Sequence, residues 1–142
     1  MELAQQLTTE TKRRFGTLGY VLPSFAVLFK ARTFGAVIQM PDERVRGRIV
    51  LYDVPFTGYG VTVRYRAQGA NRAAARGAVA ALVRSVTPVS LQTPHTGVMA
   101  AYVDSLPRIP AAAVTIEDAT MMHRLLARGE RVRVRLEMGA RM

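Results

Sequence analysis

The sequence contains no cysteine, only two histidines, and only two lysines among its 20 basic residues. The absence of cysteine excludes disulfide bonds, thiol catalysis and cysteine-ligated metal, although it does not decide the compartment. His95 and His123 are too few for a site with two zinc ions, because each ion takes about four ligands. The chain is therefore expected to be catalytically inactive by itself, with no metal or cofactor of its own.

Acidic residues are also scarce, and the formal net charge is +10. Such a basic surface attracts phosphate-rich partners, acidic membranes or an acidic neighbouring domain. The arginines, however, are scattered from Arg13 to Arg141, without a basic block and without interleaved aromatic side chains for base stacking. These arginines are therefore interpreted as a solvated surface rather than as a nucleic-acid-binding site. The alternative, a stand-alone basic module for nucleic acid or an acidic polymer, would use Arg128, Arg131, Arg133 and Arg135.

A long hydrophobic run is missing as well. The apolar segment Gly19–Phe29 follows a basic flank, as in a signal peptide, but a membrane span needs about 20 apolar residues. Pro23 and Lys30 shorten it further, and no convincing cleavage site follows. We therefore predict no membrane span and an unassigned N-terminal arm over residues 1–41, in which Phe34–Met40 is a candidate strand.

A chain of 142 residues fits one domain with a core that needs no disulfide. The β-branched run from Ile49 to Val54 predicts a buried strand that ends at Pro55. Residues 61–76 have the spacing of a helix, with Gly77 as its stop, and residues 78–83 read as a second buried strand. The apolar face of this helix is predicted at Val63, Ala67, Ala70 and Ala74. Such a strand–helix–strand unit normally forms a parallel pair.

A long connection over residues 87–110 holds four of the seven prolines, which is typical of a functional or mobile loop. Residues 111–116 predict a third strand. Glu117 and Asp118 then open a helix that ends at Gly129. Its apolar face is predicted at Met121, Met122, Leu125 and Leu126. Alternation over residues 132–136 predicts a last strand with one face on the core.

Most isolated chemical signals favour structural roles. Ser85 and Thr87 are interpreted as hydroxyls that satisfy turn backbone, because a nucleophile needs a positioned base. Gly58 and Gly60 favour a glycine-permitted turn over a phosphate site, since the dinucleotide fingerprint is incomplete. His123 is interpreted as a partly buried structural histidine, and a small phosphate-ligand enzyme at the two glycines is a distant third hypothesis.

Several motifs occur in order along the chain from Gly47 onward. They are Gly47–Phe56, Arg84–Pro88, Leu91–Gly97 and Leu106–Thr115. Together they resemble the protease-associated domain of the carboxypeptidase Q-like zinc exopeptidase family. The resemblance covers about residues 42–142. Before Asp42 an unfamiliar segment takes the place of the leading strand of that domain, and Phe34–Met40 is the candidate for this first strand.

The resemblance implies a single α/β domain with a β-rich core, of sandwich or open-barrel type, flanked by helices. It implies a non-catalytic accessory role in a secreted or periplasmic metallopeptidase that acts as a carboxypeptidase or dipeptidase. Zinc and the catalytic groups would belong to a separate catalytic domain. The expected partners are that domain and a peptide substrate, and a homodimer is left open.

His95 lies in a Pro-His-Thr-Gly turn, where it either contacts a substrate cleft or partner domain, or hydrogen-bonds its own loop. The resemblance leaves these two readings evenly balanced. The predicted contact residues are Arg84, Ser85, Thr87, Pro94, His95, Thr96 and Gly97.

Overall fold

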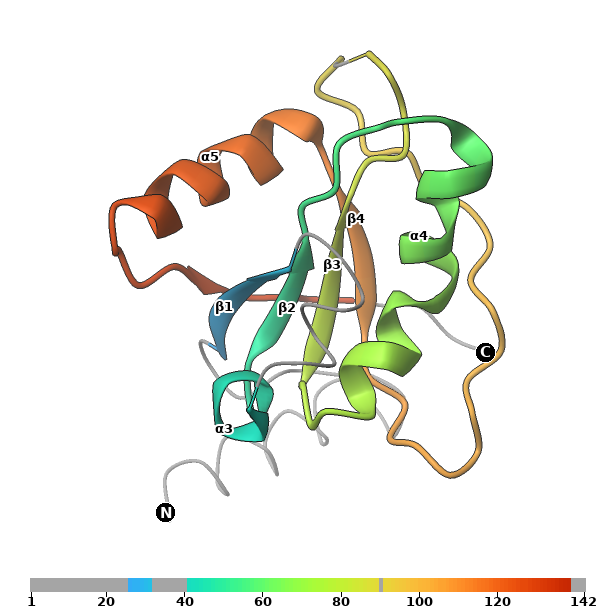
Figure 1. The fold of residues 1–142 in the computed structure, drawn as a ribbon, viewed down its shortest axis with the longest axis vertical. Helices are drawn as coiled ribbons and strands as arrows, with labels where there is room; N and C mark the ends of the chain where they lie inside the picture. The colour runs from blue at the N-terminus through green and yellow to red at the C-terminus, as the bar shows by residue number, and fades with distance from the viewer. Residues whose placement is uncertain (1–25, 32–40, 90, 139–142) are drawn as a thin grey trace.

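The computed structural model describes residues 26–31, 41–89 and 91–138 (Figure 1). Their strands form one five-stranded sheet in the order β4-β3-β2-β1-β5, in which β5 alone is antiparallel to its neighbour. The strands are β1 (Ala26–Ala31), β2 (Ile49–Tyr52), β3 (Ala80–Arg84), β4 (Ala111–Val114) and β5 (Arg133–Val134). The helices are α3 (Asp42–Val45), α4 (Tyr59–Ala74) and α5 (Ile116–Ala127).

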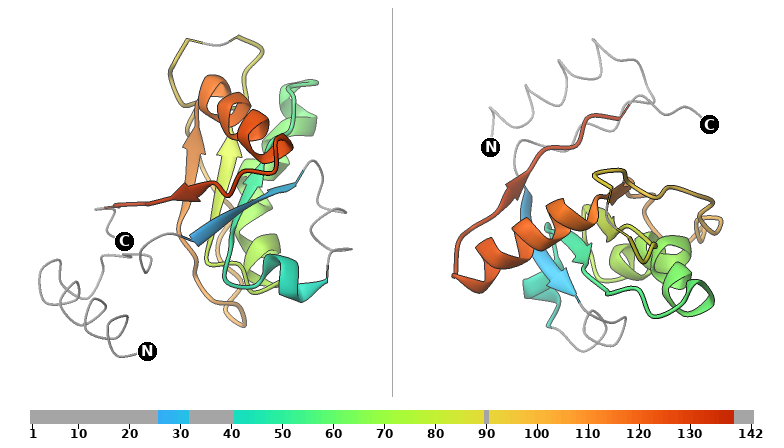
Figure 2. Two further views of the ribbon diagram at one scale, coloured as in Figure 1. Left: turned by 90° about the vertical axis from the view of Figure 1, so that its left-hand side faces the viewer. Right: turned by 90° about the horizontal axis from the view of Figure 1, so that it is seen from above.

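The central strands are buried on both faces of the sheet. In β2, Val50 and Tyr52 point to the core under α4, whereas Ile49 and Leu51 point to the core under α5. Figure 2 shows the two helices on opposite sides of the sheet. A parallel strand covered on both faces is expected to be a continuous apolar run, as β2 and β3 are. The predicted α/β class with flanking helices and a βαβ unit is therefore confirmed.

Residues 132–136 lie on the α5 side of the sheet. Val132, Val134 and Leu136 pack against the core under α5, while the arginines between them are exposed. The alternation predicted for residues 132–136 is confirmed, although the strand itself is limited to Arg133–Val134.

The sheet contains a strand that the sequence analysis left unassigned. Ala26–Ala31, within residues 1–41 that were interpreted as an N-terminal arm, forms β1 and pairs in parallel with β2. The candidate strand Phe34–Met40 lies outside the described residues. The first strand that the structure describes is therefore Ala26–Ala31, and the prediction for Phe34–Met40 stays untested.

Two predicted helix faces need correction. In α4, Val63 and Ala67 are only partly buried, because the buried side is rotated by about one residue. This side consists of Thr62, Tyr65, Arg66, Gly69, Ala70, Ala73 and Ala74. In α5, Met122 lies in the core, but Met121 is 47% exposed. Packing against the sheet, rather than apolar spacing alone, sets both faces.

Tyr52 fixes the distance between α4 and the sheet. Its ring is fully buried, and its hydroxyl donates a 3.0 Å hydrogen bond to the Gly69 carbonyl. A side-chain carbon added at Gly69 would lie 2.8 Å from Cε2 of this ring, so only glycine permits the approach. Burial raises the pKa of the Tyr52 phenol well above its usual value, which keeps the hydroxyl a donor.

The long connection predicted over residues 87–110 is tied to α4 in its second half. The Ala100 amide donates to the Ala67 carbonyl at 2.9 Å. The Asn71 amide group donates to the Ala101 carbonyl and accepts from the Val103 amide. The connection therefore runs along the helix as an ordered flank, visible beside α4 in Figure 1.

Candidate functional site

The first of the predicted contact residues, Arg84 and Ser85, lie at the edge of the sheet where the parallel strands end. Arg84 is the last residue of β3, Ser85 follows it, and Asp53 follows β2. In Figure 1 this edge lies at the top, beneath the loop that leaves β3. Ligands of open α/β sheets commonly bind outside the carboxyl ends of the strands, so this edge is the candidate site.

Asp53 is the centre of a charged cluster that the sequence analysis did not identify. Its side chain is 3% exposed, and one carboxylate oxygen accepts from Arg84 at 3.0 Å. The other oxygen lies 2.7 Å from Nδ1 of His123 on α5. Arg84 also donates to the Thr120 hydroxyl at 3.3 Å. This network joins β2, β3 and α5, so His123 has the structural role predicted for it.

Ser85 links the ends of β3 and β4 to the loop at His95. Its hydroxyl, 2% exposed, donates to the Val114 carbonyl at 2.8 Å and accepts from the His95 amide at 2.8 Å. The Thr87 hydroxyl accepts from the Val89 amide at 3.4 Å. Both hydroxyls therefore satisfy backbone groups, as predicted, and Ser85 holds the loop at His95.

Arg66 of α4 is the second residue that the sequence analysis missed. It is 8% exposed, and its guanidinium donates to Nδ1 of His95 at 3.1 Å, to the Thr96 carbonyl at 3.3 Å and to the Tyr59 hydroxyl at 2.8 Å. Since arginine only donates, Nδ1 of His95 must accept, which places the proton of the neutral ring on Nε2. His95 thus bonds α4 and Ser85 rather than its own loop.

Close packing holds the turn at Gly97 against this arginine. A side-chain carbon at Gly97 would lie 2.7 Å from Cζ of Arg66, so the backbone lies directly on the guanidinium. Pro94, His95 and Thr96 are exposed beside it. The structure therefore brings His95, Thr96 and Gly97 together on Arg66, whereas Arg84 belongs to the neighbouring Asp53 cluster.

The turn before α4 has the geometry expected of its glycines. Gly58 is the N-cap residue with φ 133°, a conformation that glycine takes readily and other residues avoid. The interpretation as a glycine-permitted turn is confirmed.

Two of the four arginines proposed for the alternative basic face have acidic neighbours. Arg128 forms an ion pair with Glu130 at 2.8 Å, and Arg135 forms one with Glu137. These exposed pairs reduce the net positive charge of the face.

Within residues 26–31, 41–89 and 91–138, no group of three or more His, Asp or Glu side chains could hold a metal ion. None of the helices in the same ranges combines the length and the hydropathy that crossing a bilayer requires.

The role of Ser85 in fixing the loop leads to a prediction. Ser85→Ala should lower the free energy of unfolding by about 1–3 kcal/mol, because it removes two hydrogen bonds, one accepted from the His95 amide and one donated to the Val114 carbonyl, each worth about 0.5–1.5 kcal/mol. It should also speed hydrogen exchange at the His95 amide. Thr87→Ala is the control and should cost less than about 0.5 kcal/mol, since its single bond is long and exposed. Equal effects of the two substitutions would contradict the assigned role.

Comparison with known proteins finds close sequence similarity. The chain is 48% identical over 104 residues to carboxypeptidase Q of Mus musculus and 50% identical over 99 residues to that of Xenopus laevis. These matches cover 73% and 70% of the chain, but only 22% and 21% of the relatives. The chain thus spans about a fifth of the length of the curated relatives it matches. No protein-family model matches it.

Solved structures of peptidases share the fold. A peptidase M28 precursor from Shewanella amazonensis SB2B superposes with a TM-score of 0.78 at 28% identity, over 87% of the chain and 29% of that protein. An aminopeptidase from Aneurinibacillus sp. strain AM-1 gives a TM-score of 0.57 at 18% identity, over 87% of the chain and 26% of that protein. The second likeness concerns the fold alone.

Proposed function

We propose, from the premise that this chain is a domain of the carboxypeptidase Q-like peptidase family, that it is a protease-associated, non-catalytic accessory domain of a zinc metallopeptidase. The observation that carries the proposal is the 48% identity to carboxypeptidase Q over a segment that makes up 22% of that protein. The accessory unit comprises residues 42–142 together with β1, which is hydrogen-bonded to β2. The partner would be the catalytic domain of the peptidase, secreted or periplasmic, which holds the zinc.

The geometry of the turn at residues 95–97 supports this accessory role. His95, Thr96 and Gly97 are exposed, yet their backbone is held by Ser85 and Arg66. A rigid scaffold that presents an exposed turn is suited to contact a peptide substrate or a neighbouring domain. The Asp53 cluster supports the scaffold by joining β2, β3 and α5. The chain would thereby shape access to a cleft whose reactive groups lie in the catalytic domain.

A segment exchange tests this role. The segment of carboxypeptidase Q that matches this chain is deleted or replaced by this chain, and hydrolysis of a dipeptide is measured. We expect the deletion to abolish activity and the replacement to restore a substantial part of it. The isolated chain should neither cleave dipeptides nor bind stoichiometric zinc.

Either activity in the isolated chain would reject the accessory role. Failure of the replacement to restore any activity, although the hybrid folds, would also reject it. A titration with single-stranded DNA at low and high salt tests the basic alternative, because phosphate contacts make affinity fall steeply with salt.

A further inference from the structure

Strand β4 forms one outer edge of the sheet, and its backbone is hydrogen-bonded on one side only. In the described part of the chain, β3 is its single neighbour in the sheet. The carbonyls of Pro110 and Val114 both accept hydrogen bonds of 3.0 Å from the β3 side. Because the backbone groups of successive strand residues alternate between the two sides, Ala111 and Ala113 direct their amides and carbonyls outward. No hydrogen bond within the described ranges uses these outward groups.

The residues of β4 do little to prevent a further strand from pairing with this edge. Natural edge strands are commonly protected by charged side chains, by proline or by a covering segment. The sequence of β4 is Ala-Ala-Ala-Val, without a charge or a proline, and all four residues are partly exposed. Only its shortness limits pairing. The small side chains let the backbone of another strand approach closely.

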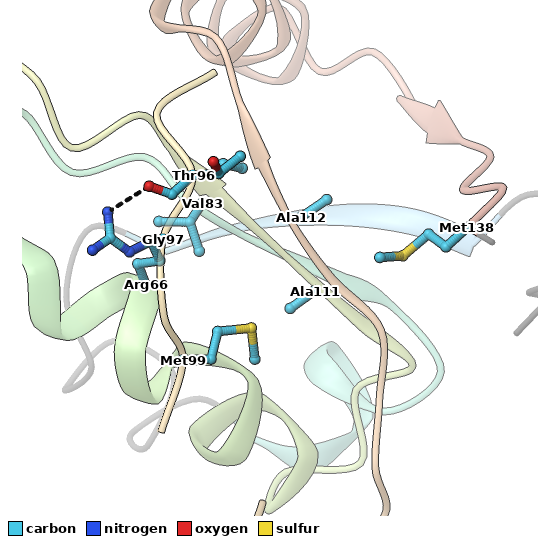
Figure 3. Close-up of a pocket in the computed structure, with 9 residues that line it drawn as sticks. Arg66, Val83, Thr96, Gly97, Met99, Ala111, Ala112 and Met138 are labelled. Carbon is cyan, nitrogen blue, oxygen red and sulfur yellow. Dashed lines mark hydrogen bonds between the residues drawn. The ribbon is translucent and has the colours of Figure 1, made fainter. Parts of the chain in front are cut away.

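A cavity of about 280 Å³ adjoins this edge, and its lining includes the three alanines of β4. Met99 and Met138 also line it, and Figure 3 shows them on opposite sides of the ribbon that carries Ala111 and Ala112. Met99 packs on the core under α4, whereas Met138 follows the segment 132–136 that packs on the core under α5. A cavity that reaches both faces of the sheet must pass the outer edge of its terminal strand. The outward backbone groups of β4 therefore border this cavity.

An extended peptide matches this arrangement of groups. Such peptides add to exposed sheet edges, where backbone hydrogen bonds provide affinity and alternate side chains provide specificity. Successive side chains of the added strand would point to opposite faces, one toward Met99 and the next toward Met138. Methionine adapts its shape to different apolar partners. The edge is therefore suited to an extended segment with aliphatic side chains.

We propose that an extended, acidic segment of the host peptidase, from outside this chain, adds to β4 as a further strand. The inference rests on the proposed accessory role. The chain matches only 22% of mouse carboxypeptidase Q, so most of such a host can supply the segment. The net charge of +10 attracts an acidic segment and opposes the pairing of two copies of this chain.

Hydrogen exchange at single amides tests the proposal in two forms of the protein, the isolated chain and the carboxypeptidase Q hybrid that carries it. In the isolated chain, the amides of Ala111 and Ala113 should exchange fast, while those of Ala112 and Val114, which face β3, should exchange slowly. In the hybrid, the first two should be protected by about tenfold or more, because each carries a new hydrogen bond. Dipeptide hydrolysis by the same hybrid reports the accessory role separately.

A proline variant shows whether the outward groups cause this protection. Ala113→Pro removes an outward donor but no bond to β3, and proline is tolerated where the N–H of an edge strand faces outward. It should keep the urea midpoint of the isolated chain and lower the protection of the Ala111 amide in the hybrid by about tenfold or more. Ala112→Pro is the control, which removes a bond to β3 and should lower the midpoint. If Ala113→Pro does not fold, the comparison of the two unmodified forms still decides.

A probe peptide tests the chemistry of the segment on the isolated chain. Acetyl-Glu-Val-Thr-Val-Glu-amide is titrated by NMR, and the version with lysine in place of both glutamates is the control. We expect the acidic peptide to shift the Ala111 and Ala113 amides and to bind about tenfold or more tightly than the control, because the chain is strongly basic.

Three results would overturn the proposal. The first is unchanged exchange at Ala111 and Ala113 in a folded hybrid, even one that hydrolyses the dipeptide. The second is protection in the isolated chain that rises with its concentration, which would assign the edge to a second copy. The third is equal binding of the acidic and the lysine peptide. A folded hybrid that is inactive but protected at these amides would reject the accessory role and keep the strand addition.

Discussion

Asp53→Ala should lower the free energy of unfolding by about 3 kcal/mol. The substitution leaves Arg84 and His123 without the buried carboxylate that joins them, and breaking a buried ion pair by removing one partner costs about 3–5 kcal/mol. The expected value lies at the lower end because the Arg84 and His123 side chains are 20% and 33% exposed and regain some solvation. Urea denaturation monitored by circular dichroism measures the change.

The control for this experiment is the exposed pair between Arg128 and Glu130. Glu130→Ala should change stability by less than about 1 kcal/mol, as for other surface ion pairs. If Asp53→Ala cost no more than Glu130→Ala, the cluster at the carboxyl edge would not be what joins β2, β3 and α5.

Gly69→Val should destabilise the domain by about 3 kcal/mol. The first added carbon would already lie 2.8 Å from the Tyr52 ring, and the ring is enclosed on all sides and bonded to the Gly69 carbonyl. Overpacking of this kind typically costs about 1–3 kcal/mol, and the larger valine places it at the upper end. The helix must move from the sheet, which thermal unfolding and the near-ultraviolet spectrum of tyrosine would both report.

Gly60 in the first turn of α4 provides a matched control. A side-chain carbon there meets nothing within 4 Å, so Gly60→Val changes helix propensity alone, by less than about 0.5 kcal/mol. A similar loss from both valine substitutions would mean that α4 is sensitive to valine itself, not to contact with Tyr52.

The elements with a strong local pattern could be predicted from sequence. β2 and β3 are apolar throughout because both faces of the sheet are covered, and residues 132–136 alternate because only one face is buried. The turn at Gly58 and the backbone role of Ser85 could also be predicted from sequence, since each follows from the residue type and its place before a helix or after a strand.

What could not be predicted depends on partners distant in sequence. Asp53 resembles an ordinary residue after a strand, and its role requires Arg84 and His123 to meet there. Arg66 stands between polar and small residues in a helix, and its burial follows from the loop that packs over it at Gly97. β1 was missed because its apolar run has no recognisable period, so only its pairing with β2 and β5 identifies it.

The pairing of β1 with β5 has an architectural consequence. The first and last described strands are hydrogen-bonded neighbours, through Ala26 with Val134 and Val27 with Arg133. The polypeptide therefore enters and leaves the sheet side by side. A unit of this layout can be inserted into a host protein through two adjacent hinges, without stretching or interrupting the host's own fold.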